Sequence, residues 1–192
     1  MDEKQQLKDF LSLIHTVPDH ILDEYASHWS PYSLSKKTIM TAPGDTEQYF
    51  YYVLSGIQKS YYLTGDKMHV IAFIYPPSFS AIPESVITGK PSKYYLETIT
   101  DSTFLRIPIS KHQELIDKHR DIETMSRKYT ETILVGLLER YYELMAFDIE
   151  TRFKSFVQRS PHLLSMVSQK DLASYLRIDP TNFSKLINSI RI

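Results

Sequence analysis

Hydrophobic residues recur at a helical spacing near the start of the chain and in short, strand-like runs further on. Within residues 4–28, Leu7 and Leu11 share one helix face, and Pro18 opens a second helical segment. Turn residues such as Gly44 separate the later runs, which are rich in β-branched and aromatic side chains. This pattern predicts N-terminal helices followed by a compact antiparallel β-roll. The expected strands cover residues 38–40, 49–54, 57–62, 69–74, 94–100 and 104–108.

Helical spacing returns at Lys111, where we expect a short helix capped by Ser110, and continues in a long helix over residues 122–147. The long helix carries two adjacent apolar stripes, although one would be enough to pack on the roll. We therefore expect it also to pack against its twin in a dimer; the alternative is a single helix buried within one domain. Gly136 costs roughly 1 kcal/mol relative to alanine, which a close approach of two backbones would offset. The stripes are Met125, Tyr129, Ile133, Leu137, Tyr141 and Leu144, and Leu134, Leu138, Tyr142 and Met145.

Residues 168–190 have the pattern of two short helices joined by a tight turn. Ser168 is placed to cap the first helix, and Asp179 and Pro180 are placed to start the second. One face of the second helix is apolar, and the other carries short polar or basic side chains, as in a helix laid into a DNA major groove. The alternative is a plain helical hairpin that packs the end of a domain. The apolar positions are Phe183, Leu186, Ile187 and Ile190, and the polar positions are Thr181, Ser184, Lys185 and Asn188.

The composition of the 192-residue chain is that of an ordinary globular protein, with 42% hydrophobic and 23% charged residues. It has no long apolar run and begins with polar and acidic residues, so we expect neither a membrane span nor a signal peptide. The net charge of −1 argues against a chain coated in nucleic acid. From Asp148 onward, however, seven basic residues outnumber four acidic ones, which gives +3 there and leaves −4 before it. A DNA-contacting module behind a sensing module would have this asymmetry.

The sequence shows no catalytic or metal-binding constellation. Its seven histidines have no metal-ligand spacing, and its five glycines form no phosphate-binding loop. The lack of cysteine excludes disulfides, thiolate-bound iron–sulfur clusters and cysteine nucleophiles. We therefore expect no enzyme, no metal site and no cofactor.

Tyrosines are concentrated in the expected roll. They are compatible with an aromatic-lined ligand pocket, and equally with strand residues whose rings pack while the hydroxyl stays wet. The tyrosines concerned are Tyr49, Tyr51, Tyr52, Tyr61, Tyr62, Tyr75, Tyr94 and Tyr95.

The order of these elements resembles the Crp/Fnr family of bacterial transcription regulators over nearly the whole chain. Gly44-Asp45, followed by the segment that ends at Gly56, is similar to the family's roll motif, with the two turn glycines twelve residues apart. Residues 144–153 resemble the hinge where the dimer helix ends, with Asp148 as the cap of the next helix, and residues 169–190 resemble the family's helix-turn-helix. The resemblance implies an α+β protein with an N-terminal antiparallel β-roll of the cupin-like, cyclic-nucleotide-binding-like type. A long dimerisation helix and a small C-terminal helix-turn-helix domain with a reduced wing would follow.

The expected domains are an effector roll with N-terminal helices over residues 1–120, a dimerisation helix over 121–147 and a DNA-binding domain over 148–192. The resemblance implies a cytoplasmic homodimer joined through residues 122–147, with no membrane attachment. Its implied partners are double-stranded DNA, a small-molecule effector and RNA polymerase. Movement of the DNA heads about residues 146–148 would couple the roll to DNA. A second hypothesis stays open: an effector-binding or protein-interaction module whose C-terminal helices no longer bind DNA.

The roll departs from the family's nucleotide-binding pattern. In cyclic-AMP-binding members, a phosphate cassette pairs a Gly-Glu with an Arg-Ser whose arginine neutralises the cyclic phosphate. Aligned on Ser92, the arginine position is Pro91 and the glutamate position is Ala81, and the long helix would offer the purine only Leu137 and Leu138. A buried phosphate without a matching cation is costly, so we predict that cyclic AMP is not the effector. The expected effector pocket comprises Tyr52, Phe79, Ser80, Glu84, Lys90, Ser92, Tyr94, Leu137 and Leu138.

The C-terminal domain departs from the family in its wing and in its base-reading residues. The hairpin that normally precedes the helix-turn-helix is shortened to residues 160–165, and we expect no closing strands. The arginines and glutamate that read guanine-rich sites are absent, so a different operator is expected, with adenine contacts through Asn182 or Asn188. Phosphate contacts supply much of the binding free energy, and Gln169, Lys170 and Arg177 are the expected replacements for the wing. The expected DNA-contacting residues are Gln169, Lys170, Thr181, Asn182, Ser184, Lys185 and Asn188.

Overall fold

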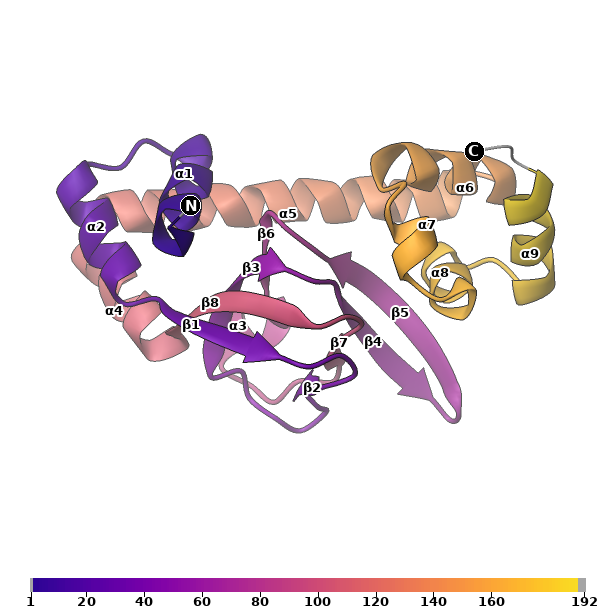
Figure 1. Cartoon of the computed structure of the whole chain (residues 1–192), viewed down its shortest axis with the longest axis horizontal. Coiled ribbons are helices and arrows are strands. Elements are labelled where there is room, and N and C mark those ends of the chain that lie inside the picture. Colours follow the sequence, from indigo (N-terminus) through magenta and orange to yellow (C-terminus); the bar gives the residue numbers. More distant parts are fainter. Residues whose placement is uncertain (1, 190–192) are drawn as a thin grey trace. The chain divides into compact units, whose positions relative to one another are not determined.

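A computed structural model of the chain describes residues 2–189, which form two compact units. The first unit contains the chain up to Ser60 together with Phe73–Ile133, and the second contains Tyr61–Ala72 together with the chain from Leu134 onward. Figure 1 traces the helices and strands of both along the sequence. The fold class is the predicted one, α+β, with antiparallel strand pairs, a long helix and C-terminal helices.

Two helices begin the chain, as the apolar spacing predicts. They are α1 (Glu3–Ile14) and α2 (Asp19–Ser27). The Asp2 carboxylate caps α1 by accepting a hydrogen bond from the Lys4 backbone N–H at 3.1 Å. Leu7 and Leu11 are buried, so the predicted inner face of α1 is confirmed.

Eight strands form two four-stranded sheets in the described part of the chain, ordered β1-β8-β3-β6 and β2-β7-β4-β5. Strand β1 pairs antiparallel with β8, β8 with β3, and β3 with β6, which gives the predicted roll its first sheet. The strands are β1 (Ser30–Leu34), β2 (Ile39–Thr41), β3 (Tyr49–Ser55), β4 (Gln58–Thr64), β5 (Lys67–Ile74), β6 (Ser78–Ser80), β7 (Tyr95–Thr98) and β8 (Ser102–Pro108).

Three short elements were not predicted. Strand β1 contains Pro31, a residue that is rare inside strands, but β1 lies at a sheet edge, where a missing N–H is tolerated. Strand β6 spans three residues, too few to show an alternating pattern. Helix α3 (Pro83–Thr88) lies where no helix was predicted; it starts with a proline at N1 and ends at Gly89 in the left-handed region.

The two helices that come after the roll agree closely with the sequence prediction. They are α4 (Ile109–Lys118) and α5 (Arg120–Ala146). The expected cap at Ser110 is wrong, because α4 begins at Ile109, two residues earlier than predicted, and Pro108 stands at the N-cap. Helix α5 has the predicted length, and its first turns enter the core through Ile122 and Met125. No described helix, α5 included, is apolar over a stretch long enough to cross a bilayer.

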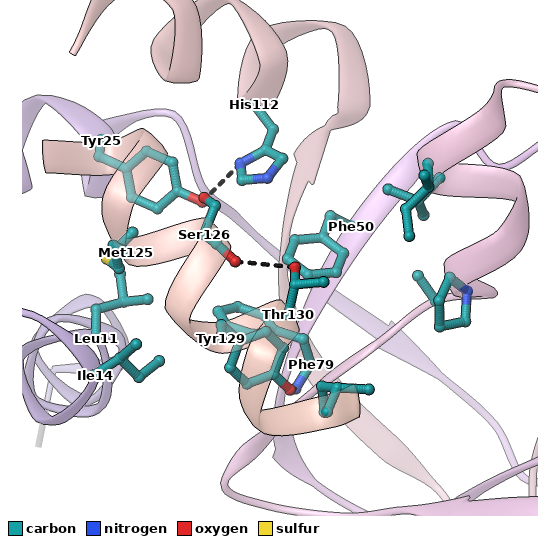
Figure 2. A pocket seen from close by; sticks show the side chains of 15 residues that line it. Leu11, Ile14, Tyr25, Phe50, Phe79, His112, Met125, Ser126, Tyr129 and Thr130 are labelled. Atoms are coloured by element: carbon teal, nitrogen blue, oxygen red, sulfur yellow. Dashed lines mark hydrogen bonds between the residues drawn. The ribbon is translucent and has the colours of Figure 1, made fainter. Parts of the chain in front are cut away.

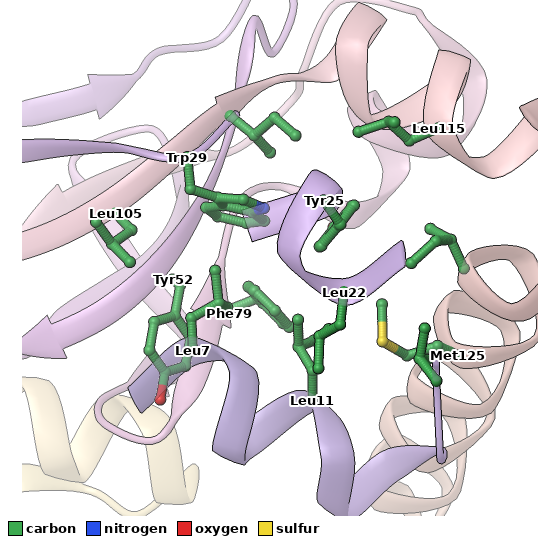
Figure 3. Packing of buried hydrophobic residues seen from close by; sticks show 13 residues of the cluster. Leu7, Leu11, Leu22, Tyr25, Trp29, Tyr52, Phe79, Leu105, Leu115 and Met125 are labelled. Atoms are coloured by element: carbon green, nitrogen blue, oxygen red, sulfur yellow. The ribbon is translucent and has the colours of Figure 1, made fainter. Parts of the chain in front are cut away.

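The main core of the first unit lies where α1, α2, α4 and the start of α5 pack on one face of the β1-β8-β3-β6 sheet (Figure 3). Trp29 and Tyr25 are almost fully buried there, with ring centroids 5.8 Å apart. Phe79 of β6 stacks on Phe50 of β3 at 4.6 Å. Tyr52 also belongs to this core. Aromatic rings therefore join the N-terminal helices to the roll.

The opposite face of that sheet is also closed by packing. Tyr51 and Phe104 lie in a second buried cluster, and the Arg106 guanidinium lies 3.8 Å from the ring centroid of Tyr32 and 4.3 Å from that of Tyr49. Burial raises the pKa of Tyr51 to about 12. The tyrosines of β3 thus pack the roll, which favours the structural interpretation of these residues.

The second unit contains four further helices among the described residues. They are α6 (Ile149–Arg159), α7 (Leu163–Met166), α8 (Gln169–Leu176) and α9 (Pro180–Ser189). Phe153, Phe156, Leu172 and Phe183 are almost completely buried and form its core. Helix α7 corrects one prediction: residues 160–165 were expected to hold a shortened hairpin, and they lead into a helical turn instead.

Candidate nucleic-acid interface and effector site

The turn between α8 and α9 is built by side-chain caps that the sequence predicted. Ser168 Oγ accepts a hydrogen bond from the Asp171 N–H at 3.1 Å and starts α8. Arg177 ends α8 in the left-handed region, with φ 56°. Asp179 Oδ1 then accepts from the N–H of Thr181 at 2.9 Å, and Pro180 is the first residue of α9. These caps fix the path of the chain from one helix into the next.

Helix α9 has one buried face and one free face. Phe183 is 1% exposed, and its ring centroid lies 5.5 Å from that of Phe153 in α6. The opposite face carries no packed side chain among the described residues: Thr181, Asn182, Ser184, Lys185 and Asn188 are all exposed. The predicted inner-face position Ile190 lies outside the described residues. The polar face of α9 is therefore available to a partner.

Three further side chains that were expected to contact phosphates are exposed near the ends of α8. Gln169 and Lys170 lie in its first turn, and Arg177 follows its last residue. Lys170 and Arg177 also line a cavity of about 800 Å³, to which Asp66 of the β4–β5 turn contributes. These residues share one side of the helix-turn-helix with the start of α9.

One contact in this unit had no signal in the sequence. Ser174 of α8 bonds to the backbone of β5: its hydroxyl donates to the Met68 carbonyl and accepts from the Val70 N–H, both at 3.0 Å. The tip of the β4–β5 hairpin is thereby tied to the first helix of the helix-turn-helix. Ser174 looked like one more helix-surface serine in the sequence.

The predicted hinge contains charged groups that hold α6 against the end of α5. Asp148 caps α6 by accepting from the Thr151 N–H at 2.8 Å, as the resemblance implied. The Glu143 carboxylate accepts from both Nη1 and Nη2 of Arg159, at 2.6 and 3.0 Å. This paired guanidinium lowers the pKa of Glu143. Within the second unit, these contacts hold α6 against the last turns of α5.

The place of the family's phosphate cassette contains a carboxylate of the chain itself. Glu47 Oε1 accepts a hydrogen bond from the Ile82 N–H, at the start of α3, at 2.8 Å, and another from Thr41 Oγ1 at 2.9 Å. The Glu47 N–H donates to Ser85 Oγ at 3.0 Å. Burial raises the pKa of Glu47, so its charge is held at a cost. A phosphate brought to the start of α3 would meet this acidic group instead of an arginine.

The structure does not gather the predicted effector residues into one cavity. Tyr52 and Phe79 pack ring to ring in the core, with centroids 5.5 Å apart. Ser80 is fully buried, and no described residue bonds its hydroxyl. Ser92 is buried and its hydroxyl bonds to the backbone of Tyr94.

Of the remaining predicted effector residues, Glu84 and Tyr94 are half-buried and the others are exposed. Glu84 pairs with Lys93 at 3.3 Å, and Lys90 is exposed. Leu137 and Leu138 are exposed on α5 and belong to the second unit. These residues stay predictions, and Phe79 is the member of the set that lines the first unit's cavity.

That cavity, of about 160 Å³, lies outside the roll, between the sheet and the helices (Figure 2). Its walls come from α1, α2, α3, α4 and the first half of α5, together with β3 and β6. Most are apolar, and Tyr25 Oη and His112 Nδ1 share a hydrogen bond of 2.9 Å on one side. No sequence pattern indicated this cavity, because its lining residues come from segments distant in the chain.

Comparison with known proteins agrees with this architecture. Residues 32–119 match the family model of the cyclic nucleotide-binding domain. No curated protein sequence matches the chain. The chain resembles the structure of FixK2 from Bradyrhizobium japonicum with a TM-score of 0.73 and 17% identity, over 83% of each chain.

Two more solved structures show the same likeness. A transcriptional regulator of the Crp/Fnr family from Eubacterium rectale gives a TM-score of 0.71 and 11% identity, over 90% of this chain and 82% of that one. The c-di-GMP-responsive global regulator CLP from Xanthomonas campestris gives a TM-score of 0.65 and 18% identity, over 89% of this chain and 90% of that one. At these identities the likeness shows the fold.

Residues 32–119 thus match the cyclic nucleotide-binding domain family, and the chain has the fold of Crp/Fnr-type transcription regulators. The resemblance inferred from the motif order is confirmed. The matched domain covers the strands of the roll, from within β1 to β8, and ends just after α4.

Proposed function

We propose that the chain is a homodimeric, DNA-binding transcription regulator whose effector is not cyclic AMP. The observation that carries the proposal is the free polar face of α9 beside a buried Phe183. A helix that only closed a domain would have no need of an exposed row of short polar side chains. This face has the dimensions and chemistry of a recognition helix.

The second half of α5 supports the dimer. Its apolar side chains are exposed within one chain, with Leu138 at 58% and Met145 at 71%. Isolated exposed apolar residues are common, but a continuous stripe along a helix marks an interaction surface. The exposed members of the stripe are Ile133, Leu134, Leu137, Leu138, Tyr141, Tyr142 and Met145. A twofold pairing through this stripe would cover them.

In this proposal residues 1–120 sense, residues 121–147 pair the subunits and residues 148–192 bind double-stranded DNA. Lys170, Arg177 and Gln169 would hold phosphates, while Asn182 and Asn188 would read adenines. RNA polymerase is the further partner expected of such a regulator. The buried Glu47 carboxylate at the start of α3 supports the exclusion of a cyclic phosphate.

Selection of bound duplexes from fragmented genomic DNA tests the proposal. We expect enrichment of an inverted repeat whose half-sites lie about ten base pairs apart, because a twofold dimer presents two copies of α9. Retention of all fragments alike, or of none, would contradict DNA-sequence recognition.

A second candidate is supported by one observation. Helix α7 (Leu163–Met166) lies where the family has a hairpin, so the wing that contacts phosphates is lacking in the described chain. A protein-interaction module derived from a regulator would show the same feature. In that case the selection experiment would recover no enriched sequence, while the dimer through α5 would persist.

A further inference from the structure

The cavity outside the roll is distinct in place from the family's nucleotide site. Its floor is Phe50 and Phe79, the rings that face away from the roll interior, and α5 covers it with Met125 and Tyr129. The cassette residues nearest to it, Ala81 and Pro83 at the start of α3, contribute apolar walls. Figure 2 shows the labelled aromatic rings arranged around one common space.

The walls of the cavity carry no charged side chain. The fifteen lining residues include no lysine, arginine, aspartate or glutamate. The single group that could titrate near neutrality is His112, and burial lowers its pKa to about 4, so it is neutral at pH 7. A charged ligand would lose its hydration here without gaining a partner. The occupant must therefore be uncharged.

A few polar atoms are nevertheless placed on one side. Tyr25 Oη and His112 Nδ1 bond to each other, which leaves Nε2 of His112 without a protein partner in the part of the chain described. The Ser126 hydroxyl likewise bonds to no other described residue. Tyr129 Oη accepts from the Phe79 N–H at 3.2 Å and can still donate. One or two hydrogen bonds to a ligand are thus available in an otherwise apolar space.

The size of the cavity and the shape of its walls further limit which molecules it can bind. A dry protein cavity of roughly 150 Å³ takes one benzene-sized ring, and this cavity is about 160 Å³. Phe50, Phe79 and Tyr129 present ring faces and edges that suit an aromatic guest. Longer chains or fused ring systems with a phosphate exceed the space.

We propose that this cavity binds a small uncharged aromatic molecule, a single ring carrying one hydrogen-bonding group. The ring would lie among Phe50, Phe79 and Tyr129, and its polar group would meet His112 or Ser126. The proposal concerns ligand binding by the first unit and does not depend on DNA binding, so each can fail without the other.

Phenol is the probe, and Trp29 is the reporter. Trp29 is the only tryptophan of the chain, it is 1% exposed, and its ring lies 5.7 Å from Phe79 and 5.8 Å from Tyr25. Titration of the full-length protein with phenol, excited where phenol does not absorb, should change its emission saturably. We expect a dissociation constant of about 1 mM or tighter, within the limits for a ligand of this size. Benzoate and cyclic AMP should bind at least about tenfold more weakly.

Two variants and a control locate the ligand. Ala81→Leu fills the space and should weaken phenol binding at least about tenfold. Ala146→Leu adds the same side chain at an exposed position of α5 and should leave phenol binding unchanged. His112→Phe keeps an aromatic ring but removes the hydrogen-bonding nitrogens, so it should weaken the binding of phenol more than the binding of toluene. Unchanged phenol binding in a folded Ala81→Leu protein, preference for benzoate, or no saturable signal with either probe would overturn the proposal.

Discussion

Glu47 places a buried carboxylate beside the segment that corresponds to the family's phosphate cassette. Its carboxylate accepts from Ile82 and Thr41 at the start of α3, where cyclic-AMP-binding relatives place a phosphate. The sequence revealed half of this change, the loss of the cassette arginine to Pro91. It could not reveal the other half, because Glu47 lies far from the cassette in the chain and only the fold brings them together.

The buried charge of Glu47 should make stability depend on pH. Burial raises its pKa in the folded state, so the folded chain binds the proton more tightly than the unfolded chain does. Its contribution to stability is then greatest in acid and is lost as the pH rises through the folded pKa. Glu47→Gln keeps an oxygen for Ile82 and removes the charge. The variant should gain about 1 kcal/mol over the wild type at pH 7.5 and little at pH ~4 in denaturant titrations.

A control substitution at a second acidic residue distinguishes this effect from a general loss of negative charge. Glu139 is exposed on α5, and Glu139→Gln serves as the control. An equal gain from Glu47→Gln at both pH values would show that its ionisation is not what costs stability.

Asp179 holds the start of α9 through its hydrogen bonds to the N–H groups of Thr181 and Asn182, at 2.9 and 3.3 Å. Asp179→Ala should lower the free energy of unfolding by about 1 kcal/mol, because two backbone donors lose their acceptor. Asp179→Asn retains a capping oxygen and should stay within a few tenths of 1 kcal/mol of the wild type. If thermal unfolding gave the same loss for both variants, the cap would not be the cause.

Among the elements, long periodic segments were predictable and short ones were not. Helices α1, α5, α8 and α9 follow from apolar spacing and caps that act within a few residues. Strand β6 and helices α3 and α7 are too short to show a period, and their formation depends on contacts with distant segments. The sequence predicted two apolar stripes on α5. It did not show which of their residues stay exposed, because the burial of Ile122 and Met125 in the core follows only from the fold.

Helix α5 yields a direct prediction about assembly. Leu138→Glu places a charge in the middle of the exposed stripe, and burying that charge against a second copy would cost several kcal/mol. We expect sedimentation to give a mass of twice 22.5 kDa for the wild type and 22.5 kDa for the variant. Thr132→Glu adds the same charge to an exposed position on another side of α5 and should remain dimeric. A monomeric wild type would remove the basis of the paired DNA heads.

The position of Gly136 on α5 leads to a prediction that tests the expected close approach of two helix backbones. It lies two residues from Leu138, which places it on the opposite side of α5 from the centre of the stripe. A Cβ built on it meets nothing within 4 Å. Gly136→Ala should therefore stabilise the protein by about 1 kcal/mol, the difference in helix propensity, without changing the dimer mass. A loss of dimer in this variant would instead support the close backbone approach that we first expected.

At the scale of the whole molecule, the sequence predicted the order of the elements and the fold, whereas the cavity of the first unit could be found only in the structure. The motif order led to the Crp/Fnr resemblance, which the fold confirms. The expected effector set followed the family's cassette, yet the cavity of the first unit draws on α1, α2 and α4, which that cassette does not include. If phenol binding is found, this fold would hold its ligand on the face of the sheet that the helices cover.

The most direct test of the account is the salt dependence of DNA binding by Lys185→Ala. Fluorescence anisotropy on an enriched duplex, between about 50 and 200 mM salt, gives the slope of log affinity against log salt. A dimer that contacts DNA through α9 loses two lysines, so its slope should become shallower by about 2. Lys36→Ala removes the same charge from an exposed turn of the roll and should leave the slope unchanged. Equal slopes for wild type and Lys185→Ala would contradict recognition through α9.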